Sequence, residues 1–122
     1  LWQCHVDRVL DEIIEISKRL MCGPIWVESN ADKGFLAAEI RKKGFKAVDY
    51  PEKENKHIKI STYARKWWDQ IEWLEGTDRD YLSQVLDYTE DAEHDDAPDS
   101  LSVVCRHLDK RNRQNYQSAF SN

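Results

Sequence analysis

The chain has 122 residues, of which 40% are hydrophobic, and its formal net charge at pH 7 is −5. This length allows one domain at most, and the hydrophobic residues, five tryptophans among them, can fill a modest core, which excludes a chain that is disordered throughout. No apolar run reaches the length of a membrane-spanning helix and no secretory leader is recognisable, so we expect a soluble intracellular protein without a membrane partner.

The first half of the chain predicts a helix, a strand, a second helix and a second strand. Apolar residues recur at helical spacing from about Asp7 to Leu20, and Cys22-Gly23-Pro24 then interrupts the pattern. The wholly apolar run Ile25-Trp26-Val27 is typical of a strand buried in a parallel sheet. A helix from about Gly34 to Lys43 leads to a strand from Phe45 to Tyr50, so the two strands should be parallel with a right-handed crossover.

The second half predicts mainly helices. The expected elements are a polar loop from Pro51 to His57, a helix near Ile60 to Asp69, a strand-like run from Ile71 to Leu74, a helix from Thr77 or Asp78 to Leu86 or Tyr88, a helix behind Pro98 to about Asp109, and a frayed polar tail. No repeat or linker interrupts the chain, so we expect one α/β unit, with residues 1–109 as its body and residues 110–122 as the tail.

The three cysteines, Cys4, Cys22 and Cys105, are an odd and scattered set. They lack the spacing of a zinc site and do not suit a disulfide framework, so we expect reduced thiols packed in the interior.

Charge is segregated along the chain. Seven acidic residues and no Lys or Arg occur from Asp87 to Asp99, whereas the stretch from Arg41 to Lys66 holds nine basic residues against three acidic ones. A basic stretch beside an acidic cluster suits a protein that holds a polyanion near a metal ion. The alternative is that both stretches are solvated faces, and charge runs alone favour that alternative.

The densest acidic motif is the segment from His94 to Leu101, at the predicted start of the last long helix. Pro98 fits a first helical turn, where its missing N–H costs nothing. Asp96 and Asp99 are three residues apart, so on a helix they share a face. With Asp95 they exceed what capping of a helix requires, and their mutual repulsion calls for a cation, for which Mg²⁺ is the natural candidate.

Glu28 is a second candidate, because it stands at the carboxyl end of a predicted buried strand, where open α/β sheets place their ligands. Taken alone, it is more simply a loop carboxylate that caps the next turn or is solvated. Taken with the aspartates, it suggests a two-metal phosphodiester site. There one ion activates the attacking water and the other stabilises the leaving oxygen, with carboxylates bridging the ions about 4 Å apart.

Three segments together resemble the nuclease domain of the large terminase subunit of tailed bacteriophages. They run from Ile25 to Gly34, over Asn55-Lys56, and from His94 to Leu101. The resemblance implies a ribonuclease-H-like mixed sheet flanked by helices and an endonuclease that cuts concatemeric genome DNA with two Mg²⁺ or Mn²⁺ ions. It also implies double-stranded DNA, a terminase ATPase domain, the small terminase subunit and the portal as partners, in the host cytoplasm.

By matched position, Glu28 corresponds to the family's central acidic ligand, and Asp96, with Asp95 beside it, to the aspartate of the last helix. These are the implied catalytic and metal-binding residues, and Asp99 is a nearby extra carboxylate. A polar-basic set near the DNA backbone is also implied, and its alternative is a solvated loop: Lys33, Asn55, Lys56 and Lys59.

The chain departs from the family in one respect. The family's first catalytic aspartate lies on an N-terminal hairpin that has no counterpart before the first predicted helix. We therefore expect a truncated nuclease domain that binds Mn²⁺ weakly and cleaves DNA poorly by itself. Another ribonuclease-H-like nuclease, such as a junction resolvase, and a non-catalytic DNA- or portal-binding fragment remain alternatives.

Overall fold

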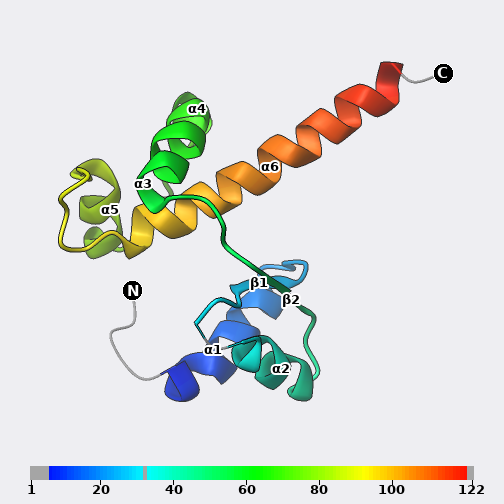
Figure 1. Ribbon diagram of the computed structural model, residues 1–122. Coiled ribbons are helices and arrows are strands. Elements are labelled where there is room, and N and C mark those ends of the chain that lie inside the picture. Colours follow the sequence, from blue (N-terminus) through cyan, green and yellow to red (C-terminus); the bar gives the residue numbers. More distant parts are fainter. Residues whose placement is uncertain (1–5, 32, 121–122) are drawn as a thin grey trace. The chain divides into compact units, whose positions relative to one another are not determined.

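A computed structural model describes residues 6–31 and 33–120, with side chains for residues 9–31 and 33–115 (Figure 1). By its internal contacts the chain divides between Lys53 and Glu54 into two compact units, which we call the N-terminal unit and the C-terminal unit. The mixed α/β class expected from the sequence is confirmed, and both described strands lie in the N-terminal unit. Two units thus stand where one α/β unit was expected.

The N-terminal unit contains α1 (Val6–Arg19), β1 (Ile25–Glu28), α2 (Phe35–Lys42) and β2 (Ala47–Tyr50). The two strands pair in parallel, with Ile25 opposite Ala47 and Glu28 opposite Tyr50. The predicted strand–helix–strand arrangement with parallel strands is therefore confirmed.

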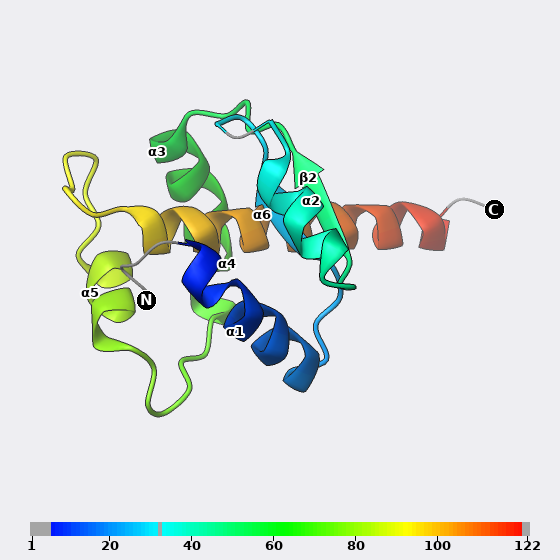
Figure 2. The ribbon, with the colours of Figure 1, turned by 90° about the horizontal axis from the view of Figure 1, so that it is seen from below.

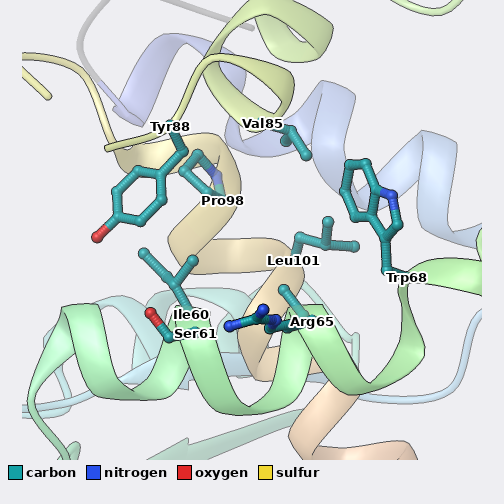
Figure 3. A pocket seen from close by; sticks show the side chains of 9 residues that line it. Ile60, Ser61, Arg65, Trp68, Val85, Tyr88, Pro98 and Leu101 are labelled. Atoms are coloured by element: carbon teal, nitrogen blue, oxygen red, sulfur yellow. The ribbon is translucent and has the colours of Figure 1, made fainter. Parts of the chain in front are cut away.

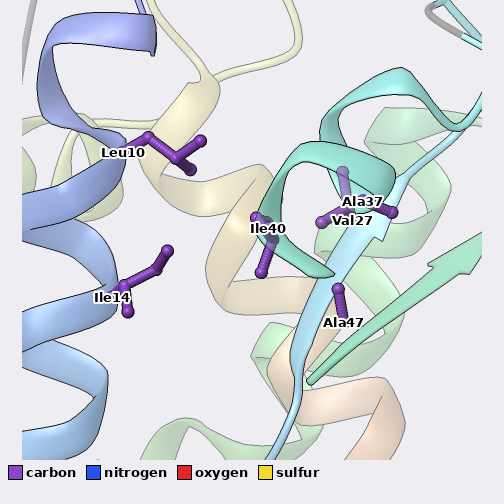
Figure 4. Close-up of a cluster of buried hydrophobic side chains, with 6 residues drawn as sticks. All are labelled: Leu10, Ile14, Val27, Ala37, Ile40 and Ala47. Atoms are coloured by element: carbon purple, nitrogen blue, oxygen red, sulfur yellow. The ribbon is translucent and has the colours of Figure 1, made fainter. Parts of the chain in front are cut away.

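Six buried apolar side chains form the core of this unit (Figure 4): Leu10, Ile14, Val27, Ala37, Ile40 and Ala47. They come from both helices and both strands, and because alternate residues of a strand point to opposite faces, Val27 faces this core. Its neighbour Trp26 points the other way, is 45% exposed, and contacts Tyr50 with 6.3 Å between the ring centroids. The two helices therefore cover the sheet face that carries Val27 and Ala47.

Glycines bound α2 on both sides. Gly34 precedes the helix with a φ of 86° and Gly44 follows it with a φ of 85°, a left-handed backbone that L residues rarely adopt. The predicted helix stop at Gly44 is thus confirmed. At Gly34 a Cβ would also lie 3.2 Å from Oδ2 of Asp49. Arg41 holds that carboxylate at 2.9 Å, and this hydrogen bond lowers the pKa of Asp49.

The C-terminal unit begins with a continuous helical segment, the 56–70 helix. It comprises α3 (Lys56–Lys59), the π-helical η1 (Ile60–Ala64), α4 (Arg65–Trp67) and the 3-10 turn η2 (Trp68–Gln70). The side-chain oxygen of Asn55 accepts a hydrogen bond from the Ile58 N–H at 3.2 Å. Asn55 is therefore the N-cap, and the predicted polar loop ends there rather than at His57.

The strand predicted at Ile71–Leu74 is wrong. This run is a connection in which Trp73 packs edge-on between Trp68 and Tyr81, with ring centroids 6.3 and 6.4 Å away. A strand needs a neighbouring strand for its backbone hydrogen bonds, and both described strands belong to the other unit. The apolar composition of the run reflects these aromatic contacts instead.

The remaining elements are α5 (Arg79–Leu86) and α6 (Asp96–Phe120). Helix α5 begins where the sequence predicts, because the Asp78 carboxylate accepts a hydrogen bond from the Tyr81 N–H at 3.0 Å. Helix α6 is uninterrupted (Figure 1, and from below in Figure 2, where part of it is hidden), so the predicted end near Asp109 and the fraying of the tail are wrong as far as Phe120. No Gly or Pro follows Pro98 in the sequence to stop it.

Three further expectations bear on the fold. Cys105 is buried as expected, whereas Cys22 is exposed, so the prediction of a packed thiol is wrong there, and Cys4 lies outside the described residues. The separation of a body of residues 1–109 from a tail of residues 110–122 stays a prediction. None of the described helices is both long enough and apolar enough to cross a membrane.

Candidate functional site

The start of α6 is organised by its backbone and by a glutamine of α5. The Asp99 N–H donates to the Asp95 carbonyl at 3.0 Å, which makes Asp95 the N-cap residue. The Ala97 N–H donates to Oε1 of Gln84 at 3.0 Å, and Pro98 is fully buried without an N–H to satisfy. Sequence reasoning missed Gln84, because nothing in the local pattern links it to a helix that begins 12 residues later.

Two lysines of α3 neutralise two of the three aspartates. The Lys59 ammonium lies 2.7 Å from Oδ1 of Asp99, with side-chain exposures of 2% and 20%. The Lys56 ammonium lies 3.2 Å from Oδ1 of Asp95 and 3.9 Å from Oδ2 of Asp99. We call these four residues the lysine–aspartate cluster.

The charges of the cluster reinforce one another. Partial burial opposes the charged form of Lys56, but the hydrogen bond to Asp95 and the negative charges of Asp95, Asp99 and Asp96 outweigh it and raise the pKa of Lys56. The ammonium therefore stays charged at neutral pH. The cation that the crowded aspartates call for is supplied, for Asp95 and Asp99, by the chain itself.

Asp96 is the exception. It is exposed at the first residue of α6, and among the described residues no side chain forms a hydrogen bond or ion pair with it. Over the same residues, no three His, Cys, Asp or Glu side chains gather in a way that could hold a metal ion. A metal site at Asp95, Asp96 and Asp99 stays a prediction.

Glu28 ends β1 with an exposed side chain, at the carboxyl edge of the two-stranded sheet. It belongs to the N-terminal unit, whereas the three aspartates belong to the C-terminal unit. The predicted convergence of Glu28 with Asp96 therefore stays a prediction as well.

The residues expected near DNA differ in their surroundings. Lys33 is exposed in a left-handed turn, and Lys56 is half-exposed although paired with Asp95. Asn55 is exposed, with its side-chain oxygen used in capping α3. Lys59 is corrected by the structure: its ammonium is buried against Asp99 and is not accessible to a DNA phosphate.

Sequence reasoning did not predict a cluster that forms around His57, in the same helix as Lys56 and Lys59. Nδ1 of His57 lies 2.8 Å from the Tyr88 hydroxyl, and Nε2 lies 3.5 Å from the Ser61 hydroxyl and 3.9 Å from the Glu90 carboxylate. Burial raises the pKa of Tyr88, and the nearby carboxylates of Asp95 and Glu90 raise it further. Only the pair of His57 and Ser61, one helical turn apart, could have been recognised from spacing.

No protein-family model matches this chain, and comparisons with curated proteins and with solved structures give no match either. A function is therefore inferred from the residues themselves.

Proposed function

We propose that this chain is part of a metal-dependent endonuclease with a ribonuclease-H-like fold, from the large terminase subunit of a tailed bacteriophage. The observation that supports the proposal most is the parallel β1–α2–β2 arrangement, which puts the exposed carboxylate of Glu28 at the carboxyl end of a strand. In open α/β sheets this edge is where ligands bind.

The proposed chemistry is hydrolysis of a DNA phosphodiester bond assisted by two Mg²⁺ or Mn²⁺ ions. Both ions prefer carboxylate oxygen, and Glu28 and Asp96 are exposed carboxylates that can offer it. Asp95 would be a secondary ligand, with the metal and the Lys56 ammonium competing for the same oxygen. Asp99 is better explained by its ion pair with Lys59 than by a direct metal bond.

The substrate of the proposed enzyme is concatemeric double-stranded viral DNA. Lys33 and Lys56 are the accessible lysines among the expected phosphate contacts. By the same resemblance, the ATPase domain, the small terminase subunit and the portal are the proposed partners, and the host cytoplasm is the proposed location.

Plasmid nicking in Mn²⁺ tests the proposal, using this chain and the complete gene product. We expect weak nicking by the chain, stronger nicking by the gene product, and loss of activity in EDTA, in Glu28→Gln and in Asp96→Asn. The matched control is Asp91→Asn, another exposed acidic residue of the same segment, which should leave nicking unchanged. Undiminished nicking in the two site variants would show that the ligands are wrong, and a gene product inert in Mn²⁺ and in Mg²⁺ would refute the nuclease.

A non-catalytic DNA- or portal-binding fragment is the second candidate. It is favoured by the lysine–aspartate cluster, because Lys56 and Lys59 already neutralise carboxylates that a metal site would use. Titration with Mn²⁺, followed by electron paramagnetic resonance, separates the two: saturable binding that is lost in Asp96→Asn supports the nuclease, and DNA binding without metal binding supports the fragment. A preference for four-way junctions over linear duplexes would favour a resolvase.

A further inference from the structure

A pocket of about 300 Å³ lies within the C-terminal unit, between the 56–70 helix, the end of α5 with Tyr88, and the first turns of α6 (Figure 3). At the volume that water occupies in the liquid, this space equals about ten water molecules. It is at the small end of the range for ligand pockets. A small organic molecule fits this space.

The walls of the pocket are mostly apolar. Ile60 and Val85 are buried, Pro98 is fully buried, and Leu101 is partly covered, while Trp68 stands half-exposed at one end. Removing apolar surface from water is favourable, so a molecule that covers these walls gains affinity from its own apolar surface. The residues around the space come from three helices and from Tyr88, just after α5.

One formal charge lines the pocket, and it is positive. Arg65 is exposed and, among the described residues, has neither an ion-pair partner nor a hydrogen-bond partner for its guanidinium. Figure 3 shows its side chain reaching across the floor of the pocket toward Ser61. This contrasts with Lys56, Lys59 and Lys66 of the same helix, each of which is paired with an aspartate.

Arg65 and the neighbouring Ser61 hydroxyl together suit an acid group. A guanidinium binds carboxylate and phosphate through two parallel hydrogen bonds and stays charged at all physiological pH values. Ser61, one turn before Arg65, adds a hydroxyl that lies 3.5 Å from His57. The Tyr88 hydroxyl is engaged by His57 at 2.8 Å, so Tyr88 contributes its ring to the wall.

We propose that this pocket binds a small organic anion, made of one flat apolar body with a single carboxylate or phosphate group. Arg65 holds the acid group, assisted by the Ser61 hydroxyl, and Ile60, Val85 and Leu101 hold the body. The site uses neither Glu28 nor Asp96, so the result of its test does not depend on whether the chain is a nuclease.

The test is a calorimetric titration of the chain with phenyl phosphate and with benzoate. We expect saturable binding at about 1 mM or below for at least one of the two, since each has few atoms to contribute affinity. The ratio of the two dissociation constants shows whether the site prefers a phosphate or a carboxylate group. Benzyl alcohol and benzylammonium, which share the ring but not the negative charge, should bind about tenfold more weakly or not at all. Inorganic phosphate should also bind more weakly, because it covers none of the apolar walls.

Variants identify the residues. Arg65→Gln should weaken binding of the anions by about tenfold or more, and Arg65→Lys should restore part of the loss. Arg111→Gln, on the exposed surface of α6, is the matched control and should bind like the unaltered chain. Equal affinity for phenyl phosphate and benzyl alcohol, unchanged binding in Arg65→Gln, or no saturable binding of either anion would overturn the proposal.

Discussion

The two units hold their carboxylates in different ways. In the N-terminal unit, the side chains of Glu28 and Asp49 are both exposed, and Asp49 forms an ion pair with Arg41, which is exposed as well. In the C-terminal unit, Asp99 and Asp109 lie on the side of α6 that packs against the 56–70 helix, and lysines of that helix pair with both. The carboxylates of the two units therefore differ in their exposure and in the partners that hold them.

Carboxylates that stabilise the fold can thus be distinguished from carboxylates that are available to a ligand. An ion pair that is shielded from water is costly to break, because the remaining charge loses its partner where water cannot replace it. An exposed carboxylate such as Glu28 or Asp96 can accept a cation or be replaced at little cost to the fold. The density of acidic residues in the sequence does not identify a metal site. The exposure and the ion pairs of each carboxylate show which ones are available to a cation.

The largest effect is expected from Lys59→Ala, which leaves Asp99 shielded and without its nearest cation. We expect the free energy of unfolding of the C-terminal unit to fall by about 3 kcal/mol, since removal of one partner of a buried pair leaves the other uncompensated. Urea denaturation measures this, with Lys110→Ala on the exposed face of α6 as control. A change within about 0.5 kcal/mol, the size typical of surface substitutions, would show that this pair is not structural.

A smaller, pH-dependent effect is expected at Asp109. The hydrogen bond from Lys66 lowers the pKa of Asp109, against the opposing effect of burial, and the charge of Arg113 lowers it further. Because the pKa is lower in the folded than in the unfolded chain, the unfolded chain binds more protons as the pH falls. The stability that Asp109 contributes is therefore complete above a pH of about 4 and is lost as the pH drops through the folded-state pKa.

The substitution Asp109→Asn makes this measurable. At pH 7 it should lower the free energy of unfolding by about 2 kcal/mol, the worth of a hydrogen bond to a charged group. The gap between the variant and the unaltered chain should then close as denaturation is repeated at progressively lower pH, below about 4. A gap that stays constant over that range would mean that Asp109 contributes through its shape rather than its charge.

In the N-terminal unit, a smaller loss of stability is expected from strain in the backbone at Gly34. Gly34→Ala should lower stability by about 1 kcal/mol, because alanine is strained at a φ of 86° and its Cβ would lie 3.2 Å from Asp49. Gly23→Ala is a matched control, since no atom lies within 4 Å of a Cβ there. Equal thermal unfolding of the two variants would contradict this account of the turn before α2.

Sequence pattern was sufficient for the N-terminal unit because its structure is specified locally. Each element is indicated by neighbouring residues: a helical stripe for α1, the apolar run before Glu28 for β1, and the stop at Gly44 for α2. The rule for strand–helix–strand units then makes the two strands parallel. The pattern failed at Ile71–Leu74, where contacts of Trp73 with Trp68 and Tyr81 rather than a neighbouring strand determine the conformation.

The candidate site was only partly predictable for a related reason. Asp95, Asp96 and Asp99 could be singled out from their spacing, and Asp78 from its position as a cap. The lysine partners of Asp99 and Asp109 come from more than 35 residues away, and single-sequence periodicity carries no information about such pairs. The same limit applies to the pocket, whose walls come from three helices and the loop after α5, which no local pattern brings together.

Two described cysteines, Cys22 in the N-terminal unit and Cys105 in the C-terminal unit, can report on the local stability of their units. Cys22 is exposed, whereas Cys105 is buried and its burial raises the pKa of the thiol, which slows its reaction because the thiolate is the reactive form. Labelling with a disulfide reagent, followed by peptide mass spectrometry to resolve Cys4, should modify Cys22 quickly and Cys105 slowly. In Lys59→Ala the labelling of Cys105 should accelerate, by about tenfold for each 1.4 kcal/mol lost, if it requires unfolding of the C-terminal unit, while Cys22 keeps its rate. Because Cys22 already reacts in the folded protein, it is the internal control, and an unchanged labelling rate of Cys105 in Lys59→Ala would show that this thiol becomes accessible without unfolding of the C-terminal unit.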